Sequence, residues 1–268
     1  MNKKVKAEAP ADYSGQSFCD FSFAPGRDLR GAIFDRANFS YVTFDRAQLE
    51  GASFKNATFE NVDFFCVNLK MANLKGARFK DVNFQGSVLA GANLKNSHID
   101  NVNLEGVNLR KANLKGAHFY NTNLRLVSLE SANCRCASFI EIDLGEANLR
   151  ETNCQEANFG YANLQNAIFQ NANLTGACLQ NANLFGANLQ RADLTGANLD
   201  FSCWPLSCGT IAAIIDKKIF SQLLYHALAT DCPEARELIQ IDRVRELAND
   251  FLRVKTGDAK ELKIKEMG

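Results

Sequence analysis

Hydrophobic residues recur at every fifth position between residues 34 and 199, without an insertion or a deletion. The recurring residue is Leu or Phe in thirty-one of the thirty-four repeats, and Ala stands two positions before it in twenty-two. The exceptions are Ile99, Cys134 and Cys154. A five-residue spacing winds around an α-helix, and on a straight strand positions five apart face opposite sides. The pattern therefore predicts short strands joined by corners, where Asn and Gly tolerate the tight backbone.

A longer period of twenty residues lies over the five-residue one. When every fourth repeat is grouped, the column that starts at Phe39 holds Phe at six of nine positions. The small inward position on the next side, which starts at Val42, holds β-branched residues at six of eight positions. Four repeats therefore form one coil, and stacked coils bury each repeat against its neighbours. The sequence predicts an all-β solenoid with four-sided coils.

Runs such as ANLKG, ANLQN, ANFGY and ADLTG resemble the repeats of the pentapeptide-repeat proteins, over roughly residues 29–200. The resemblance implies a right-handed, four-sided β-helix. With about eight to nine coils at about 4.8 Å per coil, it would form a rod about 40 Å long. Members of this family have diverse roles, so the fold alone does not give the function.

The start of the chain departs from the regular pattern. Residues 1–16 lack a hydrophobic period, and we expect a flexible leader there. The repeat region is assigned to residues 17–200, with an irregular first coil in which the apolar positions shift by one residue near Pro25. The register breaks between Phe18 and Phe23 on one side and Leu29 on the other. Such a coil would act as a cap, because an open β-helix exposes strand edges that invite pairing with other chains.

The chain changes character again after the last repeat. Residues 201–256 show helical apolar spacing and predict a C-terminal α-helical cap, whereas residues 257–268 are expected to fray. These helices would either cover the last coil or also form a homodimer interface. The residues assigned to the cap are Trp204, Ile211, Ile215, Phe220 and Leu224.

Composition and charge exclude several classes of protein. The chain has 268 residues, with 30 basic and 30 acidic side chains, which indicates neither a general nucleic-acid binder nor a strongly acidic DNA mimic. No apolar run approaches the about 20 residues of a membrane span, and the N-terminus lacks the apolar core of a signal peptide. Nine cysteines, an odd number, favour reduced thiols and a cytoplasmic location. No membrane and no direct nucleic-acid contact are expected.

Basic residues gather at one corner of the predicted coil. Five of them would stack one coil apart, and three more follow around the next corner. The eight residues are Lys55, Lys75, Lys95, Lys115 and Arg135, then Arg78, His98 and His118. Like charges at this spacing repel each other, so the column is a candidate binding surface for phosphate, nucleic acid or an acidic protein surface. The alternative is a ladder of solvated lysines whose stems cover apolar wall.

Carboxylates crowd the coils between residues 130 and 156. They could bind cations or a basic partner. However, they project from different faces, so a solvated acidic ring is the preferred interpretation.

Two sets of cysteines have possible chemistry. Cys134 and Cys154 would lie one coil apart on the same inward column, but their parallel side chains disfavour a disulfide, and they are interpreted as core residues. The residues of a second set are of types that bind Zn²⁺, but their spacing is not a standard zinc-binding pattern. We therefore prefer to interpret these cysteines as buried thiols beside a helix. The members of this set are Cys203, Cys208, His226 and Cys232. No metal or cofactor is therefore predicted.

The sequence lacks the common enzyme signatures, and a coil filled with Leu, Phe and Ala leaves no space for a substrate. We expect a non-catalytic interaction or scaffold protein that presents a rigid β-helical rod to a protein partner. The family resemblance implies an alternative, since some members modulate DNA gyrase by resembling duplex DNA. An acidic surface is what that mechanism needs, and only residues 130–156 supply one here.

Overall fold

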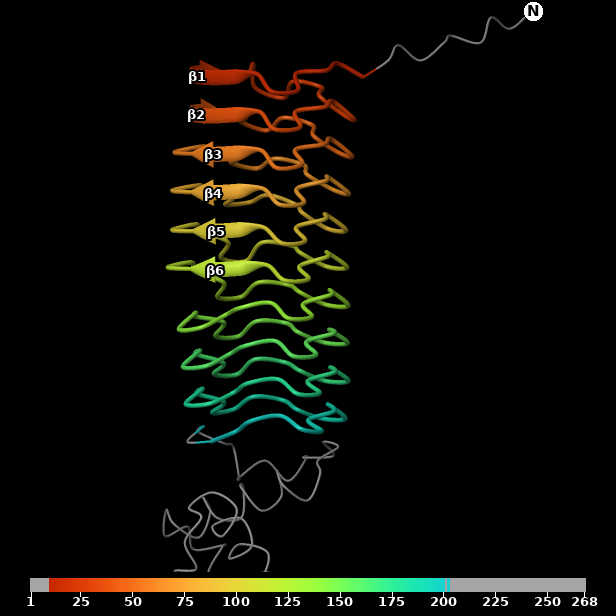
Figure 1. Cartoon of the computed structure of the whole chain (residues 1–268), viewed down its shortest axis with the longest axis vertical. Helices are drawn as coiled ribbons and strands as arrows, with labels where there is room; N and C mark the ends of the chain where they lie inside the picture. Colours follow the sequence, from red (N-terminus) through yellow and green to blue (C-terminus); the bar gives the residue numbers. More distant parts are fainter. Residues whose placement is uncertain (1–9, 201, 203–268) are drawn as a thin grey trace, which may run out of the picture.

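The computed structural model describes residues 10–200 and 202, which form a rod of stacked coils (Figure 1). The strands of one face make a six-stranded parallel sheet in which each strand pairs with the next along the chain. The strands are β1 (Ser17–Ser22), β2 (Asn38–Thr43), β3 (Thr58–Glu60), β4 (Arg78–Lys80), β5 (His98–Asp100) and β6 (His118–Tyr120). In the described part of the chain there is no helix that is long and apolar enough to cross a membrane.

Backbone pairing confirms the twenty-residue period. From β2 onward, strand partners lie twenty residues apart, as in the pairing of Thr58 with Arg78. The other three sides of the coil are joined by parallel bridges with the same separation. One set of such bridges pairs Ser53 with Asn73, Asp63 with Asn83, and Asn68 with Val88. The chain is therefore a parallel β-solenoid in which each coil turns four corners.

The interior holds the hydrophobic columns predicted from the sequence. The inward Phe and Leu residues are buried, and the rings of Phe39, Phe59 and Phe79 stack with centroids 5.0 and 4.9 Å apart. Cys134 and Cys154 are buried free thiols, as predicted. A hydrogen bond with Cys154 and burial raise the pKa of the Cys134 thiol well above its usual value. Both thiols therefore serve as core side chains.

Every corner places one residue in the left-handed backbone region. From residue 36 to residue 196, each position ending in 1 or 6 has a φ between 46° and 72°. Gly and Asn occupy many of these positions because left-handed geometry costs them least. Bulky residues occur there too, among them Tyr41 and Leu126, with φ of 54° and 59°. The corners thus impose the same left-handed backbone on residues that adopt it easily and on residues for which it is strained.

Strand structure on the Phe-rich face depends on whether the following corner is closed by a backbone hydrogen bond. After β3 to β6, the next inward residues are Val62, Val82, Val102 and Thr122. Among the described residues, no backbone hydrogen bond closes the corner before these four, whereas Ile142 and Ala162 donate to the carbonyl three residues earlier at 3.3 and 3.0 Å. Ile142 is branched as well, so branching alone does not open a corner, and the strands end where the hydrogen-bonded corner begins.

The first coil contains one extra residue. Pairs involving β1 are twenty-one residues apart, as for Phe18 and Phe39, whereas Asp28 pairs with Gln48, twenty residues ahead. This shift coincides with the irregularity seen near Pro25 in the sequence. Pairing begins earlier than expected, because Asp12 already bridges Ile33. The end of the predicted leader, residues 12–16, therefore belongs to the solenoid.

The ring of Tyr13 anchors that early segment. It stacks on Phe34 with centroids 4.8 Å apart, so it extends an interior aromatic column by one coil. The predicted helical cap, with Trp204, Ile211, Ile215, Phe220 and Leu224, lies outside the described residues. So do the zinc candidates Cys203, Cys208, His226 and Cys232.

Candidate interaction surface

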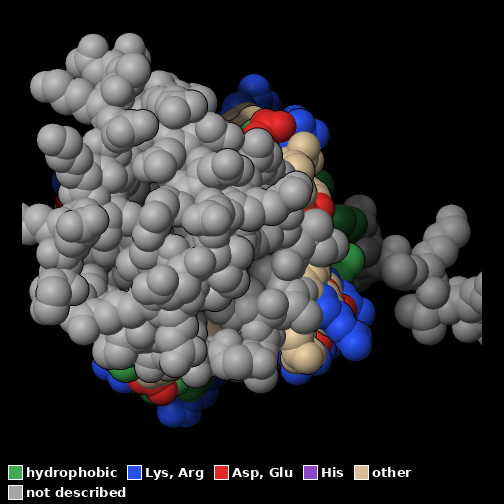
Figure 2. All heavy atoms as spheres, turned by 90° about the horizontal axis from the view of Figure 1, so that it is seen from below, with side chains coloured by type: hydrophobic (Ala, Val, Ile, Leu, Met, Phe, Trp, Pro, Cys, Tyr) green, Lys and Arg blue, Asp and Glu red, His purple; other side chains and the backbone are tan. Residues whose placement is uncertain are grey.

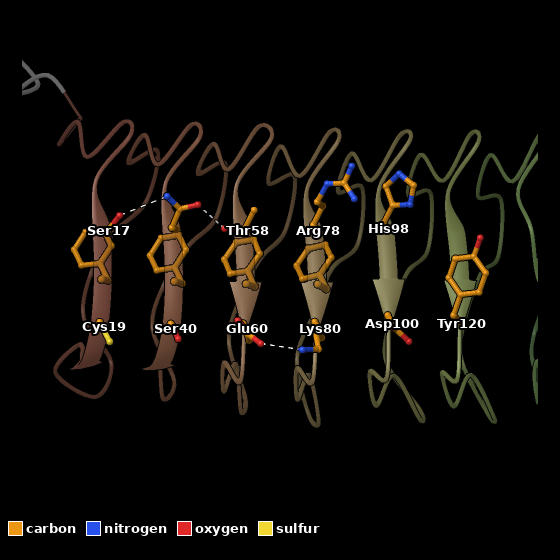
Figure 3. A pocket seen from close by; sticks show the side chains of 15 residues that line it. Ser17, Cys19, Ser40, Thr58, Glu60, Arg78, Lys80, His98, Asp100 and Tyr120 are labelled. Atoms are coloured by element: carbon orange, nitrogen blue, oxygen red, sulfur yellow. Dashed lines mark hydrogen bonds and ion pairs between the residues drawn. The ribbon is translucent and has the colours of Figure 1, made fainter.

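A shallow trough of about 550 Å³ runs over the outward side of the sheet (Figure 3). Strands β1 to β5 each contribute the two outward residues that flank the central Phe or Ile, and β6 contributes Tyr120, so the trough has two rims that follow the rod axis. One rim carries Ser17, Asn38, Thr58, Arg78 and His98. The other carries Cys19, Ser40, Glu60, Lys80, Asp100 and Tyr120.

The charges in the trough are unevenly paired. Lys80 Nζ lies 2.9 Å from Glu60 Oε1 on the second rim, and this contact raises the pKa of Lys80. Arg78 stands on the opposite rim, and no carboxylate among the described residues pairs with it (Figure 3). The trough therefore has one rim with an ion pair and the further carboxylate of Asp100, and one rim with the cation Arg78 outside any ion pair of the described residues.

The two histidines extend the Arg78 rim. The rings of His98 and His118 stack with centroids 5.3 Å apart and an interplanar angle of 11°, and His118 also stacks on Tyr120. Burial lowers the pKa of His98, and the charges of Arg78 and His118 lower it further. The neutral imidazole of His98 is thus favoured near neutral pH.

The lysines at the neighbouring corner form the predicted stack. Consecutive carbonyls of this column accept backbone N–H groups from the preceding coil, for example Asn56 to Lys75 and Gly76 to Lys95, both at 2.9 Å. Among the described residues, no carboxylate forms an ion pair with any of the four lysines. We call Lys55, Lys75, Lys95 and Lys115 the lysine column. The fifth predicted member, Arg135, differs, because its guanidinium lies 3.2 Å from Glu156.

The immediate surroundings of the lysine column are uncharged on both sides over these four coils. The preceding outward residues are Ser53, Asn73, Asn93 and Asn113, and the corner residues that follow are Asn56, Gly76, Asn96 and Gly116. Further along the same column, Gln155 and Thr175 take the place of lysine in the same type of turn. The fold therefore does not require a cation at this position.

The structure separates the eight predicted basic residues into two groups. Arg78 and His98 line the trough, and His118 stacks against its end. The lysine column and Arg135 occupy the adjacent corner and do not line the trough. The predicted site also omitted the Glu60–Lys80 pair, which could have been found as opposite charges twenty residues apart.

Three of the six carboxylates between residues 130 and 156 pair with arginines of the preceding coil. Glu130 lies 2.7 Å from Arg110, Glu156 pairs with Arg135, and Glu146 pairs with Arg125. Figure 2, a view along the rod, shows Lys and Arg side chains beside Asp and Glu side chains around the visible rim. Within the described residues, no group of His, Cys, Asp or Glu is arranged to hold a metal ion.

Comparison with known proteins places this fold in a family. The model of the pentapeptide repeat region matches residues 32–109, and that of pentapeptide repeats in eight copies matches residues 108–145, 147–184 and 179–203. These matches cover more than half of the chain. A parallel solenoid with four corners per twenty residues is the class of protein that the geometry defines. The chain belongs to the pentapeptide-repeat family.

Solved structures of the same family resemble the chain to different degrees. HetL, a protein involved in heterocyst differentiation regulation from the cyanobacterium Nostoc sp. strain PCC 7120, is 29% identical over 72% of this chain and 86% of HetL, with a TM-score of 0.70. Rfr23 from the cyanobacterium Cyanothece 51142 is 27% identical over 48% of this chain and 88% of its own, with a TM-score of 0.22. QnrB1, a plasmid-mediated fluoroquinolone resistance protein, is 20% identical over 78% of this chain and 98% of QnrB1, with a TM-score of 0.28. No curated protein matched.

Proposed function

We propose that the chain is a non-catalytic interaction protein whose rod presents the lysine column to an acidic surface of a protein partner. One observation carries the proposal: four stacked lysines have no carboxylate partner among the described residues. Like charges placed one coil apart destabilise the fold, and the same position accepts Gln155 and Thr175. A binding partner supplies the counter-charges that the rod itself lacks.

The scaffold is suited to recognition by charge. Three of the four lysines follow an Asn whose side chain fixes the turn, as where Asn93 Oδ1 accepts the Lys95 N–H at 3.2 Å, and the N–H of Lys55 is held by Asp35 of the preceding coil. Because the backbone is held by ladders on all sides, binding orders few residues beyond the lysine side chains themselves. Complementary charge accelerates encounter and sets specificity more than it raises affinity. The filled interior, with its buried Phe and Leu columns, supports a role without catalysis.

The test is affinity capture from the native host with two matched variants. Lys75→Gln with Lys95→Gln removes two positive charges and installs a residue that the column already uses. Gln85→Glu with Gln165→Glu makes the same net charge change at the diagonally opposite corner. Gln85 and Gln165 are exposed and follow the same Asn-fixed turn as the lysines. A partner identified by mass spectrometry with the wild type should be lost with the lysine variant and kept with the glutamine variant.

Two outcomes would overturn the proposal. One is a partner that binds both variants as well as the wild type. The other is a partner that both variants lose equally, because net charge rather than position would then explain binding. Circular dichroism of each variant checks that the fold is intact before capture.

Modulation of DNA gyrase is the rival function, and the charge arrangement weighs against it. Three carboxylates of the acidic region, Glu130, Glu146 and Glu156, pair with arginines. The rod therefore lacks the continuous negative surface that imitation of duplex DNA needs. We expect no inhibition of gyrase supercoiling and no protection against a quinolone in a purified assay. Either effect would replace our proposal with the rival.

A further inference from the structure

We propose that the partner element docking on the lysine column is an α-helix that lies along the rod axis and carries a stripe of carboxylates. The inference rests on the proposed function and specifies the shape of the acidic surface. It follows from the spacing of the lysines, the length of the uncompensated stretch and the small residues beside it.

The spacing of the column matches the rise of a helix. Stacked rings such as Phe59 and Phe79 lie 4.9 Å apart, which gives the distance between successive coils. Three such steps separate Lys55 from Lys115, a span of about 15 Å at the inter-strand spacing. Carboxylates at i, i+4, i+7 and i+11 lie on one face of a helix and span about 16.5 Å at 1.5 Å per residue. The lysine column and the carboxylate stripe therefore differ in length by about 1.5 Å over four contacts, which a flexible lysine side chain can accommodate.

An extended acidic segment fits the column less well. Side chains on one face of a strand are about 6.7 Å apart, so four of them span about 20 Å. After three steps the carboxylate and the lysine would be out of step by about 5 Å, which is a full coil. An extended chain can therefore engage only some of the lysines at once, whereas a helix can engage all four.

The uncompensated stretch is bounded at both ends. At one end Asp35 Oδ1 accepts the backbone N–H of Lys55 at 3.0 Å and the hydroxyl of Ser53. At the other end Glu156 pairs with Arg135, and its pKa is lowered by a hydrogen bond from Cys136, by Arg135 and by Lys115. A partner carboxylate is therefore attracted to the four coils between these acids. That length corresponds to about three helical turns.

The corner beside the column leaves room for a helix. The residues that follow the lysines are Asn56, Gly76, Asn96 and Gly116, so no long side chain stands between the column and the Arg78 rim. The Gly76 and Gly116 corners have φ of 69° and 65°, which glycine adopts without strain. Arg78, around that corner, can add a fifth contact to the flank of a helix about 10 Å wide.

The experiment uses three labelled, alanine-rich peptides of about twenty residues, long enough to form helix in water. The stripe peptide carries Glu at i, i+4, i+7 and i+11. The dispersed peptide has the same composition with the Glu residues spread around the helix. The broken peptide keeps the stripe positions but has a central proline, which disrupts the helix. Fluorescence anisotropy at low salt measures binding to the full-length wild type, to Lys75→Gln with Lys95→Gln, and to Gln85→Glu with Gln165→Glu.

The stripe peptide should bind the wild type about tenfold more tightly than the dispersed or the broken peptide, because exposed ion pairs add only up to about a factor of five each. Its affinity should fall about tenfold with the lysine variant and change less than twofold with the glutamine variant. Circular dichroism confirms the helicity of each peptide.

The possible failures are distinguishable. If all three peptides bind equally and all lose affinity with the lysine variant, the helical inference is wrong and the proposed function stands. If the lysine variant does not weaken any peptide, both are wrong. A single-stranded oligonucleotide run as a competitor provides the last arm: tighter binding than the stripe peptide, lost with the lysine variant, would assign the column to nucleic acid instead.

Discussion

The left-handed backbone conformation at a corner costs free energy when the residue has a side chain, and a substitution to Gly can measure this cost. Leu126 is 48% exposed and has a φ of 59°, so it accepts left-handed strain while burying little surface. Replacing it with Gly should raise the free energy of unfolding by about 0.5–1 kcal/mol, the left-handed penalty less the entropy that Gly loses on folding. Leu126→Ala is the control, because it keeps the Cβ that causes the strain. Urea denaturation distinguishes them, and equal stability of the two variants would contradict the argument.

The environment of His98 predicts its titration. Burial and the charges of Arg78 and His118 lower its pKa, so an NMR titration should give a value below the 6.5 of an unperturbed histidine. Arg78→Gln removes one of these causes and should move the pKa upward. A value above 6.5 in the wild type would show that the stacked imidazole is stabilised in its charged form instead.

The same shift makes stability depend on pH. Because the pKa of His98 is lower in the folded protein, the unfolded chain binds its proton more readily. The contribution of His98 is therefore present above about pH 6.5 and is lost as the pH falls below that value. His98→Asn, which copies Asn38 and Asn158 of the same column, should reduce the loss of stability between pH 7.5 and pH 5 in urea denaturation.

At the scale of the coil, the stacked phenylalanines predict a graded response to truncation. Phe59 is 2% exposed and stacks on Phe39 and Phe79. Phe59→Ala should lower the free energy of unfolding by about 3–5 kcal/mol, because the neighbouring coils are held apart and leave a cavity. Phe59→Leu should cost much less, about 1–2 kcal/mol, since Leu179 fills the same column further along. Equal losses in denaturant titrations would mean that aromatic stacking, rather than volume, sets the stability.

The sequence predicted well which side chains point into the coil, and the reason is physical. Inward positions are set by backbone geometry alone, so the five-residue period is sufficient to place Phe59 and Leu179 in the interior. The pairing of Asp12 with Ile33 was missed because its segment carries no hydrophobic repeat. The ion pair of Arg125 and Glu146 was missed because these residues stand twenty-one positions apart, in neighbouring columns, and the rotamers of long side chains decide such pairs.

At the scale of the whole molecule, the lysine column should cost stability in the absence of a partner. Stacked like charges repel through solvent, so Lys75→Gln with Lys95→Gln should raise the free energy of unfolding by about 0.5–1 kcal/mol at low salt. The gain should shrink at 1 M salt, where the Debye length falls to about 3 Å. Gln85→Glu with Gln165→Glu should give no such gain. A lysine variant that is less stable at low salt would show that the column supports the fold.

The constant separation of backbone partners, from Asn38 with Thr58 to Cys178 with Asn198, has a consequence for how such chains change over generations. A gain or loss of twenty residues inserts or removes one coil and leaves all other columns aligned. Any other change in length rotates the faces beyond it. The single extra residue lies between Ser22 and Asp28, where the described residues that precede it form only part of one coil. Duplication within the gene would therefore adjust the length of the lysine column in steps of one coil, about 4.8 Å, and so match it to a proposed helical partner of a different length.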